Sequence, residues 1–266
     1  MSRIAIILLI VLPALSKGQV APLFEELVIT SYVKPSVQES QKLTHFIQTL
    51  QRQEVKSEKK FLKSIFKLTH QKFLKSYSQY ADLGEALTSG RFDCLTGTAL
   101  LSTVLTEAHF DYRIMETNYH IFMLVNTKEG QVLLETTDRL SGFVDDPDEI
   151  NKRIASYRQN MIMNVSNDKT YYEYGFDLFR EVRPSQLAGL LYFNQAIKAY
   201  NKHDLLGCAS LLEQSKRIYE SPRIEELAIV LVKSILESDL SATVKGRVIQ
   251  QYKNYVFGKT SPVASR

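Results

Sequence analysis

The chain has 266 residues, of which 44% are hydrophobic and 23% charged, with a formal net charge of +4. This length and composition are typical of a globular protein that buries one large core or two small ones. The small charge argues against nucleic-acid binding, and the lysines between residues 56 and 75 follow a helical pattern that indicates a solvated helix face.

The first 18 residues are predicted to be a signal peptide. Arg3 supplies a positive start, residues 4–15 form an apolar run, and Ser16 and Gly18 are small residues ahead of a cut before Gln19. The run is too short for an ordinary membrane span, and an uncleaved N-terminal anchor is the alternative interpretation. No later apolar run reaches about 18 residues, so we expect an exported protein, periplasmic or secreted, with no stable membrane span after cleavage.

Residues 20–89 are expected to be mainly helical. After a short apolar segment at 23–29, apolar residues at helical spacing mark one helix over 36–53 and another from residue 57 onward. Helices are expected up to about residue 89, with a bend near residues 80–82. Packing against the next helix is the role we assign to these helices, and contact with a protein partner is the alternative.

The stretch that begins at Gly90 carries the first candidate functional residue. Gly90 breaks the preceding helix, and Asp93 is a good N-cap because its carboxylate can accept from the free N–H groups of a first helical turn. Cys94 then falls in that turn, where the unpaired N–H groups and the helix dipole favour a thiolate. The helix is predicted over 94–108, and Gly97 allows a strand to approach its backbone closely.

Three β-patterned segments follow this helix, at residues 110–117, 119–126 and 131–137. A short glycine-containing turn joins the last two into an antiparallel hairpin. His120 lies at the start of the second segment, and Glu135 lies near the end of the third. A cysteine at a helix start, a histidine on a strand and a carboxylate on the next strand have the order of an activated-thiol triad.

Three short runs around these positions carry a family resemblance. They are Gly-Arg-Phe-Asp-Cys-Leu-Thr-Gly-Thr-Ala-Leu-Leu at 90–101, Tyr-His-Ile-Phe-Met-Leu-Val at 119–125 and Val-Leu-Leu-Glu-Thr-Thr at 132–137. They resemble the nucleophile helix, the histidine strand and the acid strand of the transglutaminase-like superfamily, which has a papain-like fold. The resemblance covers about residues 85–145. It implies an α+β fold in which the Cys helix packs on an antiparallel sheet, and we expect this domain to span 19–183.

The chain departs from the family at two points. It has no tryptophan, and it carries Glu135 where the family usually has aspartate. Asp138 competes with Glu135 for the role of the acid, although its position past the strand also suits a turn cap. The resemblance implies that Cys94 attacks, that His120 pairs with the thiolate and then protonates the leaving group, and that the acid orients the imidazole.

Two functions are consistent with these residues. The first is an exported cysteine enzyme, a hydrolase or acyl transferase that acts on amide bonds (peptidase, amidase or transglutaminase) through a thioester. The second is a catalytically inactive transglutaminase-like domain that serves as a protein-binding or assembly module. The missing tryptophan and the Glu135 exchange favour the module, whereas the presence of both Cys94 and His120 favours the enzyme. A protein or peptide is the expected partner in both cases, and the oligomeric state stays open.

The sequence implies no cofactor and no metal, because two cysteines form no zinc cage and the five histidines lack ligand spacing. The second cysteine, Cys208, could pair with Cys94 in an exported protein. Its flanking leucines, however, indicate a small buried hydrophobe.

The rest of the chain is predicted to change from mixed to purely helical. A helix near 147–159 and strands at 161–165 and 170–174 complete the first domain, a helical segment spans 184–257, and residues 258–266 are expected to be disordered. The helix pair 187–201 and 205–219 resembles a tetratricopeptide (TPR-like) unit. Its small, packing and closing positions are occupied by Ala196, by Cys208 or Ala209, and by Pro222. A plain helical cap is the alternative, and a second helix pair is expected at 223–236 and 242–257.

Overall fold

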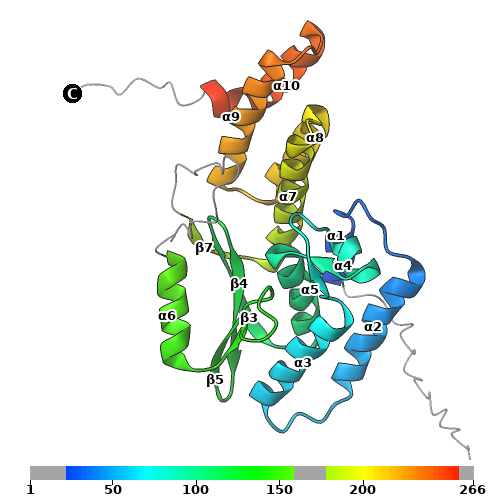
Figure 1. The fold of residues 1–266 in the computed structure, drawn as a ribbon, viewed down its shortest axis with the longest axis vertical. Coiled ribbons are helices and arrows are strands. Elements are labelled where there is room, and N and C mark those ends of the chain that lie inside the picture. Colours follow the sequence, from blue (N-terminus) through cyan, green and yellow to red (C-terminus); the bar gives the residue numbers. More distant parts are fainter. Residues whose placement is uncertain (1–21, 159–177, 258–266) are drawn as a thin grey trace, which may run out of the picture.

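The computed structural model describes residues 22–158 and 178–257. The predicted signal peptide, the predicted strands at 161–165 and 170–174, and the predicted disordered tail lie outside the described residues. The described chain is an α+β protein, as expected, with an antiparallel sheet set among helices (Figure 1).

The N-terminal helices begin where capping residues stand. α1 (Pro22–Val28), α2 (Val37–Gln51) and α3 (Glu58–Lys72) confirm the expected helices. Ser36 and Ser57 cap α2 and α3, because each hydroxyl oxygen accepts from a backbone N–H in the first turn. All three helices contact α5 (Cys94–Glu107), which is the role predicted for them.

The expectation of helices up to residue 89 is confirmed for residues 83–88 and wrong for residues 73–82. The chain instead forms β1 (Ser76–Tyr77), α4 (Leu83–Thr88) and β2 (Arg91–Phe92), and β1 pairs with β2 in parallel. Asp82 starts a new helix because its carboxylate accepts from the N–H of Glu85 at 2.8 Å. Gly90, at φ +79°, turns the chain so that its carbonyl accepts from the N–H groups of Lys75 and Ser76.

α5 lies beneath a sheet with the strand order β6-β5-β4-β3-β7, in which all pairs are antiparallel. The strands are β3 (Asp111–Thr117), β4 (Ile121–Thr127), β5 (Gly130–Leu134), β6 (Phe143–Val144) and β7 (Phe179–Val182). α5 and the three longest of these strands confirm the predicted elements. Gly130, at φ +117°, forms the predicted tight turn between β4 and β5.

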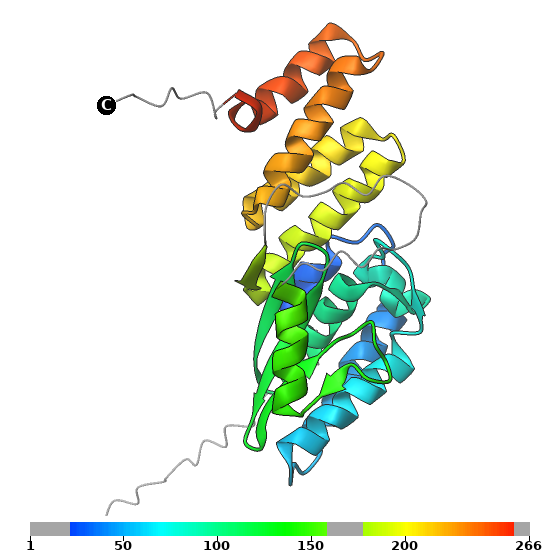
Figure 2. The same ribbon diagram turned by 60° about the vertical axis from the view of Figure 1, so that its left-hand side comes forward.

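Apolar side chains alternate between the two faces of this sheet. Ile121 and Met123 of β4 join the main core around α5, whereas Phe122 and Leu124 join a smaller cluster covered by α6 (Pro147–Arg158). Both faces are therefore covered, which explains the nearly unbroken apolar run along β4. Figure 2 shows α6 on the outer face of the sheet.

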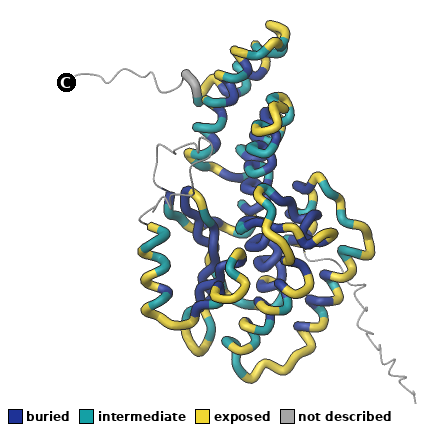
Figure 3. The backbone as a smooth tube through the Cα atoms, viewed as in Figure 1, coloured by how far each residue is buried: buried dark blue, intermediate teal, exposed yellow. Residues whose placement is uncertain are grey.

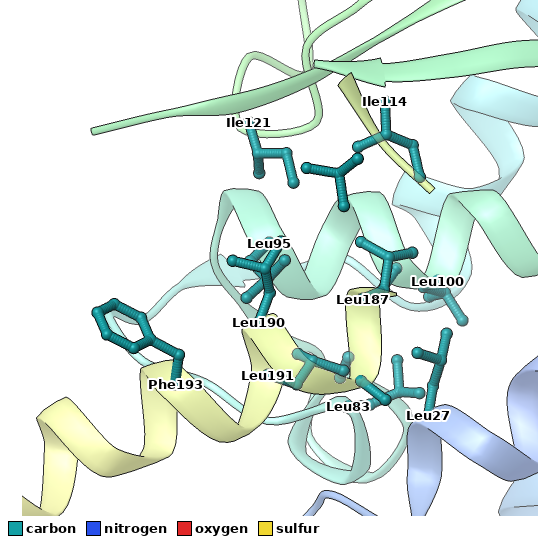
Figure 4. Close-up of a cluster of buried hydrophobic side chains, with 14 of the residues drawn as sticks. Leu27, Leu83, Leu95, Leu100, Ile114, Ile121, Leu187, Leu190, Leu191 and Phe193 are labelled. Carbon is teal, nitrogen blue, oxygen red and sulfur yellow. The ribbon is translucent and has the colours of Figure 1, made fainter. Parts of the chain in front are cut away.

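The main core also includes the first helix of the C-terminal segment. η1 (Pro184–Gln186) leads into α7 (Leu187–Asn201), which packs on α5 from the side away from the sheet. Figure 4 shows Leu190 and Leu191 of α7 on one side of α5, with Ile114 and Ile121 of the sheet on the other. α5 is consequently buried over most of its surface, as Figure 3 shows.

The remaining helices confirm both predicted helix pairs. They are α8 (Leu205–Ile218), α9 (Pro222–Glu237) and α10 (Ala242–Phe257). They stack in succession on α7 and lead away from the sheet (Figures 1 and 2). Across the described ranges, no helix combines the length and the apolar character that a membrane crossing needs.

Candidate active site

Cys94 is the first residue of α5, and the chain just before it is tightly held. Asp93 is the predicted N-cap, and its Oδ1 accepts from the N–H of Thr96 at 2.8 Å. Its Oδ2 accepts from Nδ2 of Asn194 on α7 at 3.1 Å, so the C-terminal segment helps to fix the helix start. Burial raises the pKa of the Asp93 carboxyl against the opposing effect of its hydrogen bonds. Cys94 itself is half-buried and carries a free thiol.

Gly97 allows the segment after β5 to approach α5 closely. A Cβ at residue 97 would lie 2.7 Å from Oγ1 and 2.9 Å from Cβ of Thr136. Thr136 Oγ1 in turn donates to the carbonyl of Cys94 at 3.2 Å. The close approach predicted from Gly97 is therefore present, and it joins α5 to the segment that carries Glu135.

His120 lies in a tight turn immediately before β4. Its carbonyl accepts from the N–H of Thr117 at 2.8 Å, and its N–H donates to Thr117 Oγ1 at 3.0 Å. Its ring contacts Phe122 and Tyr157, with ring centroids 6.4 and 5.2 Å away. The prediction that His120 shares a face with Phe122 is thus confirmed. Because His120 stands at the end of the sheet, its ring also interacts with Cys94 of α5, which lies against the other face.

Glu135 directly follows β5, and its side chain is 7% exposed. Oε2 contacts Nε2 of His120 and accepts from the Tyr157 hydroxyl at 3.3 Å. Oε1 accepts from the N–H and the hydroxyl of Thr137, at 3.1 and 2.6 Å. Burial works to raise the pKa of Glu135, but His120 and the Thr137 hydrogen bonds outweigh it and hold the pKa below its ordinary value. The carboxylate is therefore charged and fixed in position at neutral pH.

The imidazole of His120 interacts with Cys94 and Glu135 together. Its side chain is 21% exposed. Burial works to lower its pKa, but hydrogen bonding and charge from Cys94 and Glu135 raise the pKa from 6.5 to about 10. Since Nε2 is engaged by Glu135, Nδ1 is the ring nitrogen left for the thiol. This geometry favours an imidazolium held beside the charged Glu135 carboxylate.

Asp138, the other candidate acid, caps a turn. Its Oδ1 accepts from the N–H groups of Leu140 and Ser141 at 3.2 and 2.8 Å. Its carbonyl accepts from the N–H of Gly142 at 2.8 Å. Of the two acids, the structure therefore brings Glu135 to His120 and leaves Asp138 in the turn that follows.

Cys208 does not join the site. It is fully buried on α8, and its thiol is free, so the alternative of a disulfide with Cys94 is not formed. Burial, reinforced by the charge of Asp204, raises the pKa of the Cys208 thiol to about 12. In the part of the chain that the structure describes, no three His, Cys, Asp or Glu side chains are arranged to hold a metal ion.

The sequence analysis missed two neighbours of this site. Tyr157 of α6 donates to Glu135, and His70 of α3 lies with its Nε2 2.8 Å from the carbonyl of Thr136. Tyr157 continues the helical spacing of Ile150 and Ile154, which pack against the sheet, and this spacing could have identified it. His70 stands alone in a helix pattern, where no local signal distinguishes it from a core residue.

These observations define a class, an α+β protein with a half-buried thiol at a helix N-terminus beside a histidine and a buried carboxylate. Comparison of the chain with models of protein families, with curated proteins and with solved structures finds no match. The case for a particular activity therefore rests on the residues and geometry of the site.

Proposed function

We propose that the protein is an exported cysteine enzyme with a transglutaminase-like, papain-like core that acts on amide bonds through Cys94, His120 and Glu135. The observation that carries the proposal is the interaction of the His120 imidazole with both the Cys94 thiol and the buried Glu135 carboxylate. The packing of α5 on an antiparallel sheet supports the same fold. A protein or peptide is the proposed substrate.

In the first half of the reaction, the Cys94 thiolate attacks the carbonyl carbon of the amide. The backbone N–H of Cys94 at the start of α5 stabilises the oxyanion that forms, and one such donor contributes about 3 kcal/mol. His120 gives its Nδ1 proton to the departing amine as the C–N bond breaks, and a thioester remains on Cys94. Glu135 stays charged throughout and holds the imidazole by Nε2.

In the second half, water or a second amine attacks the thioester carbonyl. His120 accepts the proton of the attacking group, the C–S bond breaks, and the Cys94 thiolate is restored with its imidazolium partner. Attack by water gives a peptidase or amidase, and attack by an amine gives an acyl transferase. Both outcomes use the same three residues.

The proposal is tested by the pH dependence of Cys94 alkylation with iodoacetamide, in a Cys208→Ser background that leaves a single thiol. A thiolate held by an imidazolium reacts well below pH 7, because the reactive form persists there. We expect fast alkylation at pH 5.5 and its loss in His120→Ala. Glu135→Gln is expected to slow the reaction at this pH, since the imidazolium loses its charged partner.

Asp138→Asn is the matched control, because it changes the competing acid in the same way and leaves His120 untouched. A reaction that follows an ordinary thiol and ignores His120 would refute the enzyme. That result would favour the inactive module, in which the helices α7–α10 bind a protein partner.

Export is a separate part of the proposal. It is supported by the sequence pattern of residues 1–18. N-terminal sequencing of protein recovered outside the cytoplasm is expected to begin at Gln19. Retention of the first 18 residues on membrane-bound protein would favour the uncleaved anchor.

A further inference from the structure

A second histidine lies buried behind the candidate site. His70, on α3, is 2% exposed. Its Nδ1 lies 2.9 Å from the carbonyl of Phe66, and its Nε2 lies 2.8 Å from the carbonyl of Thr136. Its ring packs on Phe66 and Phe92, at centroid distances of 4.4 and 6.2 Å. The imidazole therefore bridges α3 and the segment after β5, two parts of the chain 66 residues apart.

His70 faces the carbonyl of Thr136, the residue that links Cys94 to Glu135. Thr136 is fully buried, and its hydroxyl donates to the carbonyl of Cys94 at 3.2 Å. It is bonded directly to Glu135 on one side and on the other to Thr137, which donates two hydrogen bonds to the Glu135 carboxylate. A shift of the Thr136 peptide would move Glu135 relative to His120.

We infer that His70 is a positioning residue, which holds the Thr136 peptide by its Nε2 and so sets the place of Glu135 and Cys94 around His120. This inference rests on the proposed function for its chemical consequence. The hydrogen-bond geometry on which it stands does not depend on that function.

The two ring nitrogens of His70 can be tested separately. The amide nitrogen of glutamine lies near the place of imidazole Nε2, and the amide nitrogen of asparagine lies near the place of Nδ1. His70→Gln can therefore keep a donor for Thr136, whereas His70→Asn can keep one only for Phe66. If His70 only filled the core, the two variants would differ in stability according to the volume that each removes. The pKa of His120 would then be the same in both.

The readout is the titration of His120, followed by nitrogen–proton correlation NMR of histidine-labelled protein. The charged and titratable groups that face His120 are Cys94 from α5, Glu135 after β5 and Tyr157 from α6. In the wild type we expect a pKa near 10 for His120. His70→Asn is expected to lower it by about one unit or more, since a displaced Glu135 no longer supports the imidazolium. His70→Gln is expected to keep it near the wild-type value.

His45→Asn is the matched control, because it makes the same exchange at an exposed position of another helix, α2. Thermal unfolding of each variant verifies that the titrated protein is folded, and lower temperature keeps a weakened variant native. If His70→Asn leaves the His120 titration unchanged, the positioning role is overturned while the proposed function stands. If His120 titrates as an ordinary histidine in the wild type, both are overturned.

Discussion

Removing the carboxylate of Glu116 is expected to destabilise the protein strongly. Glu116, on β3, has a side chain that is 2% exposed and lies between two arginines. Arg180 of β7 and Arg223 of α9 approach it at 3.2 and 3.3 Å, and the Tyr219 hydroxyl donates to it. Glu116→Ala leaves the two guanidinium groups close together without their shared counter-charge.

The size of the effect follows from the burial of this cluster. Breaking a buried ion pair by removing one partner costs about 3–5 kcal/mol, because the remaining charge loses its counter-charge in a buried place. Arg223 is 11% exposed and bears this penalty, whereas Arg180 is 33% exposed and is partly screened by water. We therefore expect a loss of about 3–4 kcal/mol in the free energy of unfolding, out of a total of about 5–15 kcal/mol.

Urea unfolding measures this loss. With a slope of about 3 kcal/mol per molar urea, the midpoint is expected to fall by about 1 M. Glu213→Ala is the control, because Glu213 also faces two cations, Lys216 and Arg217, but its side chain is 24% exposed. Its loss is expected to stay below about 1 kcal/mol. Equal midpoints for the two variants would refute the reasoning that the Glu116 cluster stabilises the fold.

Four further predictions concern the site and the C-terminal helices. Gly97→Val is expected to lower the free energy of unfolding in urea by about 1–3 kcal/mol, because its Cβ would overlap Thr136. A Cβ added at Gly246 in α10 would contact nothing within 4 Å. Gly246→Ala is therefore expected to raise the free energy of unfolding by about 0.5–1 kcal/mol. His120, with its pKa raised from 6.5 to about 10, contributes stability that is fully present below pH 6.5 and lost as the pH rises through 10. The loss in the free energy of unfolding that His120→Ala causes, measured with urea, is therefore expected to shrink between about pH 6.5 and 10. A loss that stays constant over this range would contradict the raised pKa. Cys208, whose pKa is about 12, is expected to resist iodoacetamide at pH 8 in the native protein and to react in urea, as mass spectrometry can measure.

The sequence predicted the helices and the long strands because their burial pattern is local. α7, α8 and α10 were placed within a residue of their ends, since apolar positions recur along each of them at helical spacing. β3 was recognisable by its alternation of apolar and polar residues, and β4 by a short apolar run that ends at a glycine-containing turn. Elements whose stability comes from their own periodic pattern are the ones that a sequence reveals.

The elements that were missed depend on distant partners. β1 and β2 have two residues each and exist only because they pair with each other across α4. β7 carries the charged residues Arg180 and Glu181, so its sequence does not resemble a strand beside a core. Arg180 is tolerated there because it stands directly opposite Glu116 on β3. No local pattern records this pairing, which joins residues 64 apart in the chain.

The choice between Glu135 and Asp138 illustrates the same limit within the site. Both acids follow β5, and the sequence orders them without deciding between them. Two backbone hydrogen bonds of Gly142 separate the roles of the two acids. Its N–H donates to the carbonyl of Asp138, and its carbonyl accepts from the N–H of Glu135 at 2.7 Å. This folds the chain into a turn that occupies Asp138 and leaves only Glu135 directed at His120.

The predicted domain boundary at residues 183–184 does not separate the candidate site from the helices that follow it. Asp93, beside the thiol, is held by Asn194 of α7, and Thr117, in the turn of His120, is held by Arg223 of α9. α7 is itself part of the core around α5. A chain cut at residue 183 would expose the apolar side of α5 and release both ends of the Cys94–His120 pair. α7 and α9 therefore help to hold the candidate site in place.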